Sequence, residues 1–69
     1  MEFSLEGKSF IELNRVVKYI GWADSGGEAN RLIDEGKIYV NGTQEFRRRN
    51  KLKAGDKVQW DKQECLILL

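Results

Sequence analysis

The chain of 69 residues has no histidine and a single cysteine, Cys65. Zinc sites of the Cys/His type and Ser-His or Cys-His nucleophile pairs are therefore excluded. A lone cysteine cannot form an internal disulfide, and it is interpreted as a small buried hydrophobe. The chain contains no P-loop or dinucleotide fingerprint, and its carboxylates are scattered without an evident pair. We expect a protein that is not an enzyme and that needs no metal or cofactor.

Long apolar runs are also missing. No stretch reaches the roughly 18 apolar residues that a transmembrane helix needs. The beginning of the chain lacks a basic-then-apolar signal peptide. With 41% hydrophobic and 33% charged residues, the composition is typical of a soluble globular domain. We therefore expect one domain over residues 1–69, located in the cytoplasm and not bound to a membrane.

Charge is nearly balanced overall but uneven along the chain. The net charge is only +1, which by itself is a weak indication of nucleic-acid binding. Residues 1–30 hold five acids against three bases, whereas residues 47–53 hold five bases and no acid. A local basic patch attracts phosphate even in a nearly neutral protein. A run of charges is also, more commonly, just solvated surface.

Two helices are expected, over about residues 10–20 and 26–35. Each follows an S-x-x-E capping box, Ser9/Glu12 for the first helix and Ser25/Glu28 for the second. Gly21 and Gly36 stand where these helices would end. Apolar residues recur at helical spacing in both segments. They are Leu13, Val16, Val17 and Ile20 in the first segment, and Ala29, Leu32 and Ile33 in the second.

Alternating apolar and polar residues predict strands around these helices. They are expected at 2–6, at 37–40 and 43–46 around an Asn41-Gly42 hairpin turn, around Val58 and Trp60, and at 64–69. The run Arg47–Arg49 is expected in an irregular loop, or in a strand that exposes arginine on both faces. Phe46 is interpreted as a core residue, with a stacking ring as the alternative.

These elements predict an α+β fold, with two helices packed on one face of a small, mostly antiparallel sheet. The predicted shared core consists of Leu13, Val16, Val17, Ile20, Leu32, Ile33, Ile38, Val40, Val58 and Ile67.

The order of the motifs resembles a known family. Leu13-Asn14-Arg15, Ser25 to Ala29, Leu32-Ile33, Gly36-Lys37, Val40-Asn41-Gly42, Arg47–Arg49 and Gly55-Asp56 together resemble the αL RNA-binding motif of ribosomal-protein-S-four-type domains, in a small stand-alone bacterial form. No single motif is specific, but the ordered set covers most of the chain. The resemblance implies an RNA-binding surface made by two helices and the following hairpin.

The resemblance also implies which residues meet RNA. By position, the implied set is Arg15, Lys18, Ser25, Gly26, Gly27, Arg31, Lys37, Arg47, Arg48, Arg49 and Lys51. Three departures weaken a direct transfer, because many members have arginine in place of Glu12 and of Gly26, and often lysine in place of Asn30. The implied partner is structured RNA, with ribosomal RNA as one candidate and no small-molecule substrate.

Plainer interpretations of the same residues remain open. Ser25 and Glu28 fit a simple helix cap as well as a phosphate site, and such a cap contributes about 1 kcal/mol. Arg15 and Lys18 fit a solvated helix face, and Asn41-Gly42 fits turn geometry alone. The alternative function is a non-catalytic scaffold that binds protein through its sheet. The sequence is silent on the oligomeric state.

Overall fold

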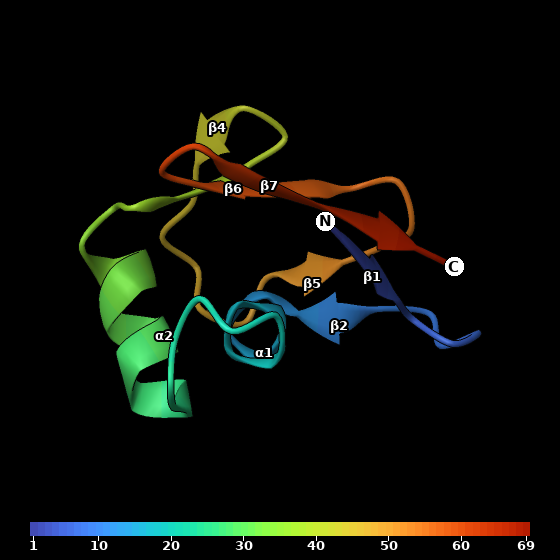
Figure 1. Ribbon diagram of the computed structural model, residues 1–69, viewed down its shortest axis with the longest axis horizontal. Coiled ribbons are helices and arrows are strands. Elements are labelled where there is room, and N and C mark those ends of the chain that lie inside the picture. Colours follow the sequence, from blue (N-terminus) through green and yellow to red (C-terminus); the bar gives the residue numbers. More distant parts are fainter.

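A five-stranded sheet lies over two helices in the computed structural model, which describes residues 1–69 (Figure 1). The helices are α1 (Leu13–Tyr19) and α2 (Gly26–Asp34). The sheet has the order β1-β7-β6-β3-β4, and β2 and β5 form a separate antiparallel pair. The strands are β1 (Glu2–Ser4), β2 (Ile11–Glu12), β3 (Ile38–Val40), β4 (Thr43–Gln44), β5 (Lys51–Leu52), β6 (Lys57–Trp60) and β7 (Gln63–Leu68).

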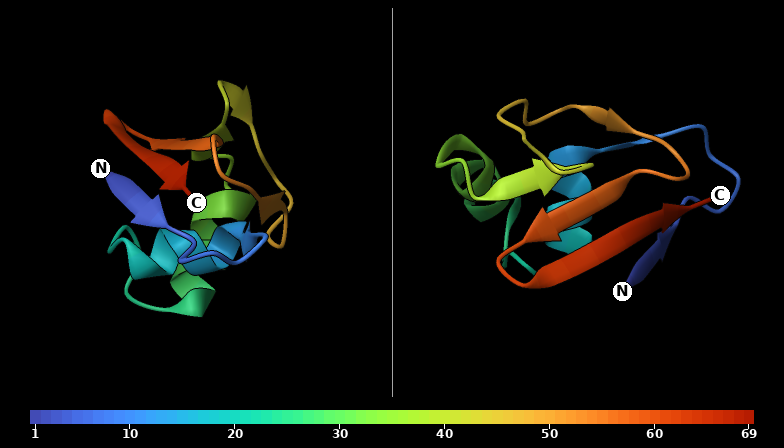
Figure 2. Two further views of the ribbon diagram at one scale, coloured as in Figure 1. Left: turned by 90° about the vertical axis from the view of Figure 1, so that its right-hand side faces the viewer. Right: turned by 90° about the horizontal axis from the view of Figure 1, so that it is seen from above.

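The predicted α+β architecture is confirmed. Seen from above, β3, β6 and β7 lie side by side in front of α1 (Figure 2). All pairs in the large sheet are antiparallel except β1 with β7, which closes one edge in parallel. The hairpin is also confirmed, because Asn41 and Gly42 have φ of 53° and 84°, as a type I′ turn requires. Neither helix is long and apolar enough to cross a membrane.

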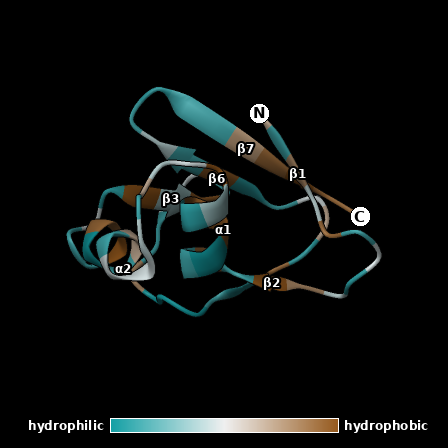
Figure 3. Ribbon diagram, turned by 60° about the horizontal axis from the view of Figure 1, so that its bottom comes forward, coloured by the Kyte–Doolittle hydropathy of each residue, from teal (hydrophilic) through white to brown (hydrophobic).

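The core fills the space between the sheet and the helices. Nine of the ten predicted core residues are buried, and the tenth, Ile20, is half-buried and packs against them. Cys65 is fully buried as predicted, and burial raises the pKa of its thiol. Hydrophobic residues are conspicuous in β2 and the C-terminal half of β7 (Figure 3). The prediction did not include Leu52, which is fully buried in β5.

Phe46 was predicted to be a core residue, and this is wrong. The second hairpin strand ends at Gln44 rather than at residue 46, and Phe46 lies in the loop that follows, 56% exposed. The chain leaves the large sheet there and next forms β5, which pairs with β2 and in which Leu52 supplies the buried side chain. The strand predicted at 2–6 is also shorter, because the turn begins at Glu6, with φ of 54°.

The predicted capping box at the start of α1 is wrong as well. The N-cap residue is Glu12, its side chain makes no cap hydrogen bond, and Ile11–Glu12 form β2 instead of a helical turn. The first helical N–H groups find acceptors elsewhere. The N–H of Leu13 donates to the Asn50 carbonyl at 2.9 Å, and the N–H of Asn14 donates to the Arg48 carbonyl at 2.9 Å. A later loop thus caps the helix, and Ser9 is not needed.

Both helices end as predicted, in the hydrogen-bond pattern of a Schellman motif. Gly36, with φ of 75°, donates to Ile33, and Lys37 donates to Leu32, at 3.0 and 3.1 Å. Gly21, with φ of 88°, ends α1 in the same way. Glycine suits these positions because it has no Cβ to clash in the left-handed conformation.

The two glycines differ in one respect that predicts different effects of substitution. A Cβ at Gly21 would meet nothing within 4 Å, whereas a Cβ at Gly36 would collide with the Gln44 amide and come within 3.2 Å of the Phe46 ring. The Gln44 amide donates to the Gly36 carbonyl at 2.7 Å, so moving it breaks a hydrogen bond. Both alanine variants carry left-handed strain of about 1–2 kcal/mol. Gly36→Ala should cost about 1 kcal/mol more than Gly21→Ala in urea unfolding. Equal losses would contradict the close packing at Gly36.

Candidate nucleic-acid interface

The loop between β4 and β5, residues 45–50, is the centre of the candidate site, and we call it the arginine loop. Its backbone is irregular, which confirms the first of the two predicted alternatives, a loop rather than a strand. Its backbone is fixed against the start of α1 by the carbonyls of Arg48 and Asn50. The fold therefore places three consecutive arginines beside the first helix, although about 30 residues separate them in the sequence.

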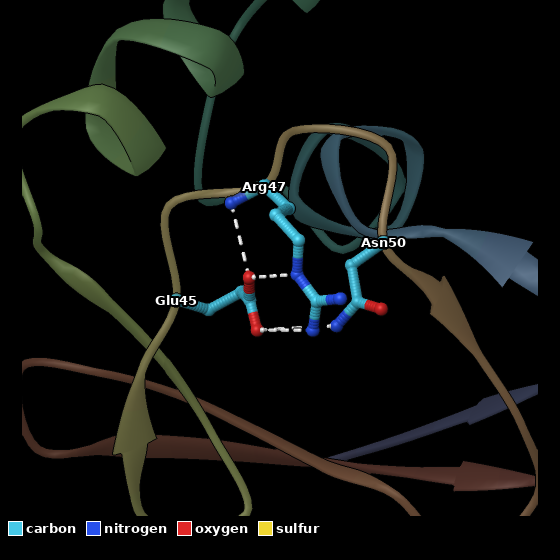
Figure 4. Close-up of polar contacts among 3 residues, drawn as sticks. All are labelled: Glu45, Arg47 and Asn50. Atoms are coloured by element: carbon cyan, nitrogen blue, oxygen red, sulfur yellow. Dashed lines mark hydrogen bonds and ion pairs between the residues drawn. The ribbon is translucent and has the colours of Figure 1, made fainter.

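Each arginine of the loop pairs with a carboxylate. Arg47 binds Glu45 through two side-chain contacts of 2.8 and 3.2 Å, and Asn50 donates to the same carboxylate at 3.3 Å (Figure 4). Arg48 pairs with Asp34 at the end of α2. Arg49 donates to Glu12 at 2.9 Å. Residues 47–53 contain no acid, but three acids from outside that run, Glu45, Asp34 and Glu12, pair with its three arginines in the structure.

These pairs are formed at neutral pH and leave the arginines accessible. The hydrogen bonds from Arg49, Arg48 and Arg47 lower the pKa values of Glu12, Asp34 and Glu45 below their ordinary values of 4.5, 3.8 and 4.5. Because the folded-state pKa values are depressed, the stabilisation is present above the ordinary values and is lost as the pH falls through the folded ones. The side chains of Arg47, Arg48 and Arg49 are 75%, 51% and 78% exposed. A phosphate can therefore reach each guanidinium.

A surface depression of about 470 Å³ brings together residues from three parts of the chain. Arg15 and Lys18 reach it from α1, Gly26 from the start of α2, and Arg49 from the arginine loop. The Glu12 carboxylate lies between Arg15 and Arg49, at 3.3 and 2.9 Å, and holds both. Four of the eleven predicted site residues therefore meet in one place, which we call the basic depression.

The side chains of Ser25 and Glu28 cap the start of α2. The Ser25 hydroxyl accepts a hydrogen bond from the Glu28 N–H at 3.1 Å. The Glu28 carboxylate accepts from the Asp24 N–H at 3.4 Å and pairs with Arg31 at 3.6 Å. Ser25 and Glu28 thus form the predicted helix cap. Of Ser25, Gly26 and Gly27, only Gly26 lines the basic depression.

The remaining predicted residues lie outside this depression. Lys37 pairs with Glu35 at 3.4 Å, just beyond the end of α2. The Lys51 ammonium lies over the Phe10 ring, 4.9 Å from its centroid. Arg31, Arg47 and Arg48 are exposed but do not line the depression either. They extend the candidate surface around it, over the second helix and the arginine loop.

The structure adds contacts and groups that were not among the predicted site residues. Asn14 and Asn30 join the two helices through a side-chain hydrogen bond of 3.0 Å, and Asn14 lines the basic depression. Tyr19 also lines it and is 57% exposed. The family motif contains Asn14, but only the packing of α1 on α2 shows what it contacts. Nothing in the local sequence marks Tyr19.

Comparison with known proteins shows the family of the chain. The pattern of the S4 domain matches residues 3–68, nearly the whole chain. The chain belongs to the S4 domain family. It is 40% identical over 58 residues to the Escherichia coli K12 protein named "Putative RNA-binding protein YbcJ", covering 84% of this chain and 83% of that protein. A Shigella flexneri protein, also named YbcJ, matches equally well.

The solution structure of E. coli YbcJ, described as revealing an αL motif involved in RNA binding, is similar to this S4 domain. The TM-score is 0.76 at 34% sequence identity, covering 99% of this chain and 86% of that one. The predicted resemblance is therefore confirmed at the level of family and fold. The match does not identify individual contact residues.

Proposed function

We propose that this S4 domain binds structured RNA in the cytoplasm through the basic depression and the arginine loop, without catalysis. Ribosomal RNA is one candidate target. The observation that carries the proposal is the meeting of Arg15, Lys18 and Arg49 in one depression, with two further exposed arginines, Arg47 and Arg48, in the same loop as Arg49. The RNA-binding description of the E. coli relative supports it. Duplex RNA offers phosphates and 2′-hydroxyl groups rather than readable base edges in its deep groove, and a small basic surface suits such a target.

Titration of a fluorescently labelled RNA hairpin at several salt concentrations tests the proposal. Binding that neutralises phosphates releases counterions, so log affinity should fall linearly with log salt. The slope should correspond to about −0.7 to −0.9 per phosphate contact. Absence of binding, or binding that is insensitive to salt, would refute the proposal and favour a scaffold that binds protein.

The ion pair between Arg48 and Asp34 gives a sharper prediction. Asp34→Asn removes the carboxylate that competes with phosphate for Arg48 and also removes a negative charge from the surface. RNA affinity should rise, and the salt slope should steepen by about 0.7, the contribution of one added phosphate contact. Anisotropy titrations of variant and parent across salt concentrations measure both effects.

Glu64→Gln is the matched control. It removes the same charge and also breaks an ion pair, here with Lys57 at 3.6 Å on the sheet. It should leave affinity and slope nearly unchanged, since long-range effects are screened within about 10 Å at 0.1 M salt. An equal rise in both variants would show that only net charge matters. No rise with Asp34→Asn would show that Arg48 does not meet RNA.

A further inference from the structure

A second pocket, of about 630 Å³, adjoins the basic depression. It lies between the segment from β1 to β2 and the first helix, and it shares Glu12, Arg15, Tyr19 and Arg49 with the depression. The two hollows therefore form one continuous surface. Its lining is more apolar than that of the depression and includes three aromatic rings, those of Phe3, Phe10 and Tyr19.

Two of the three rings are exposed, although each also contacts another side chain. Phe3 and Tyr19 stack nearly parallel, with centroids 6.2 Å apart and an angle of 17° between the rings. Tyr19 is 57% exposed and Phe10 is 39% exposed, so neither ring is buried in the core. Exposed aromatic rings beside cationic side chains are the combination on which proteins stack unpaired bases.

The charges around the pocket favour a nucleotide over an apolar peptide. Arg15 and Arg49 stand where the pocket meets the basic depression, and Lys8 also lines the pocket. Lys51 lies over the Phe10 ring. A strand whose phosphate contacts Arg15 and Arg49 has its adjacent base beside an aromatic surface. Glu6 and Glu12 line the pocket too, so its basic side chains outnumber its acidic ones by three to two. A phosphate pairs with these basic groups, whereas an apolar segment of a protein has no group that does so.

The geometry points to a subsite for one unpaired nucleobase, which stacks on Tyr19 or Phe10 while its phosphates lie on Arg15 and Arg49. This rests on the proposed RNA-binding function and narrows its target. Bases in a duplex are stacked inside the helix and cannot enter such a pocket, whereas bulges and loops present bases that can. The preferred RNA is therefore a stem with an unpaired nucleotide beside it.

Two RNA hairpins with the same stem test the subsite. One carries a single bulged 2-aminopurine, whose fluorescence falls on stacking, and the other has the same base paired in the stem. The protein should bind the bulged hairpin about 5- to 150-fold more tightly, the effect of one base–aromatic stack, and should quench its fluorescence. Tyr19→Leu should abolish most of this preference, and because Tyr19 also lines the basic depression, its affinity for the paired hairpin should fall as well, but much less than its affinity for the bulged one.

Two further variants serve as controls. Tyr19→Phe keeps the ring and should keep the preference, which separates stacking from any loss of folding. Tyr39→Leu changes an exposed tyrosine of β3 that lines neither hollow and should alter nothing. Equal affinity for the two hairpins, or an unchanged preference in Tyr19→Leu, would overturn the subsite even though salt-dependent RNA binding persists. Failure of the parent protein to bind either hairpin would overturn the subsite and the proposed function together.

Discussion

A variant in which Arg47, Arg48 and Arg49 are all replaced by alanine should lose much of its affinity for structured RNA. It should also show a shallower salt slope, since each lost phosphate contact removes about 0.7. Arginine is the residue whose loss matters most here, because its planar guanidinium meets phosphate oxygens two at a time. Anisotropy titrations over several salt concentrations measure affinity and slope together.

The same variant should keep its melting temperature. All three side chains are more than half exposed, and ion pairs at such positions contribute little to stability. The loop is held against α1 by the backbone carbonyls of Arg48 and Asn50, which alanine at residues 47–49 leaves in place. Weaker binding accompanied by a lowered melting temperature would instead show that the arginines fix the loop.

Replacement of Lys53, Lys57 and Lys62 by alanine is the matched control for charge. These exposed lysines lie on or next to the turns and strands of β6 and β7, outside both hollows. Their loss changes the net charge by the same amount as the loss of the three arginines. The control variant should bind RNA nearly as tightly as the parent protein. A loss equal to that of the arginine variant would mean that RNA is attracted by overall charge rather than by the arginine loop.

The sequence predicted the helix ends well because their causes are local. A glycine in the left-handed conformation and hydrogen bonds to residues three and five positions earlier end α1 at Gly21 and α2 at Gly36. The Ser25 cap likewise involves a residue only three positions away. Such features depend on a few neighbouring residues, so the order of amino acids is enough to recognise them.

The start of α1 was mispredicted because its cause is distant. Ser9 and Glu12 have capping-box spacing, but the carbonyls that satisfy the helix belong to Arg48 and Asn50. Glu12 is used differently, as the carboxylate between Arg15 and Arg49. The capping-box spacing is a sound local signal, but here a tertiary contact caps the helix instead, and sequence spacing does not reveal that contact.

In the candidate site, too, local features were predictable from the sequence and contacts between distant residues were not. The arginine loop was visible as a run of charge, and the alternation of strand side chains left an irregular loop as one of two alternatives. The partners of these arginines were not visible, because Asp34 and Glu12 come close only when the loop folds back on both helices. The aromatic pocket was equally hidden, since Phe3, Phe10 and Tyr19 come from three separate segments. The fold decides which of these residues lie close together, and so their contacts could be seen only in the structure.

Truncation of Leu52 should have the largest effect on stability. This side chain is fully buried among the core residues, and it belongs to β5, which returns the chain from the arginine loop. Leu52→Ala should cost about 2–5 kcal/mol, because removing the buried methyl groups also leaves a cavity. A chain of 69 residues has a total stability of roughly 3–10 kcal/mol. The variant should therefore be partly or largely unfolded near body temperature.

Phe46→Ala is the contrasting variant six residues earlier. It removes more side-chain atoms, but the ring is 56% exposed and lies outside the buried core, so the loss should be about 1 kcal/mol or less. Urea unfolding followed by tryptophan fluorescence suits both variants, because Trp22 and Trp60 pack together with ring centroids 5.7 Å apart. If Phe46→Ala proved more destabilising than Leu52→Ala, the assignment of Leu52 rather than Phe46 to the core would be wrong. In that case β5 would not hold the arginine loop in the way described, because the burial of Leu52 is what anchors the C-terminal end of the loop.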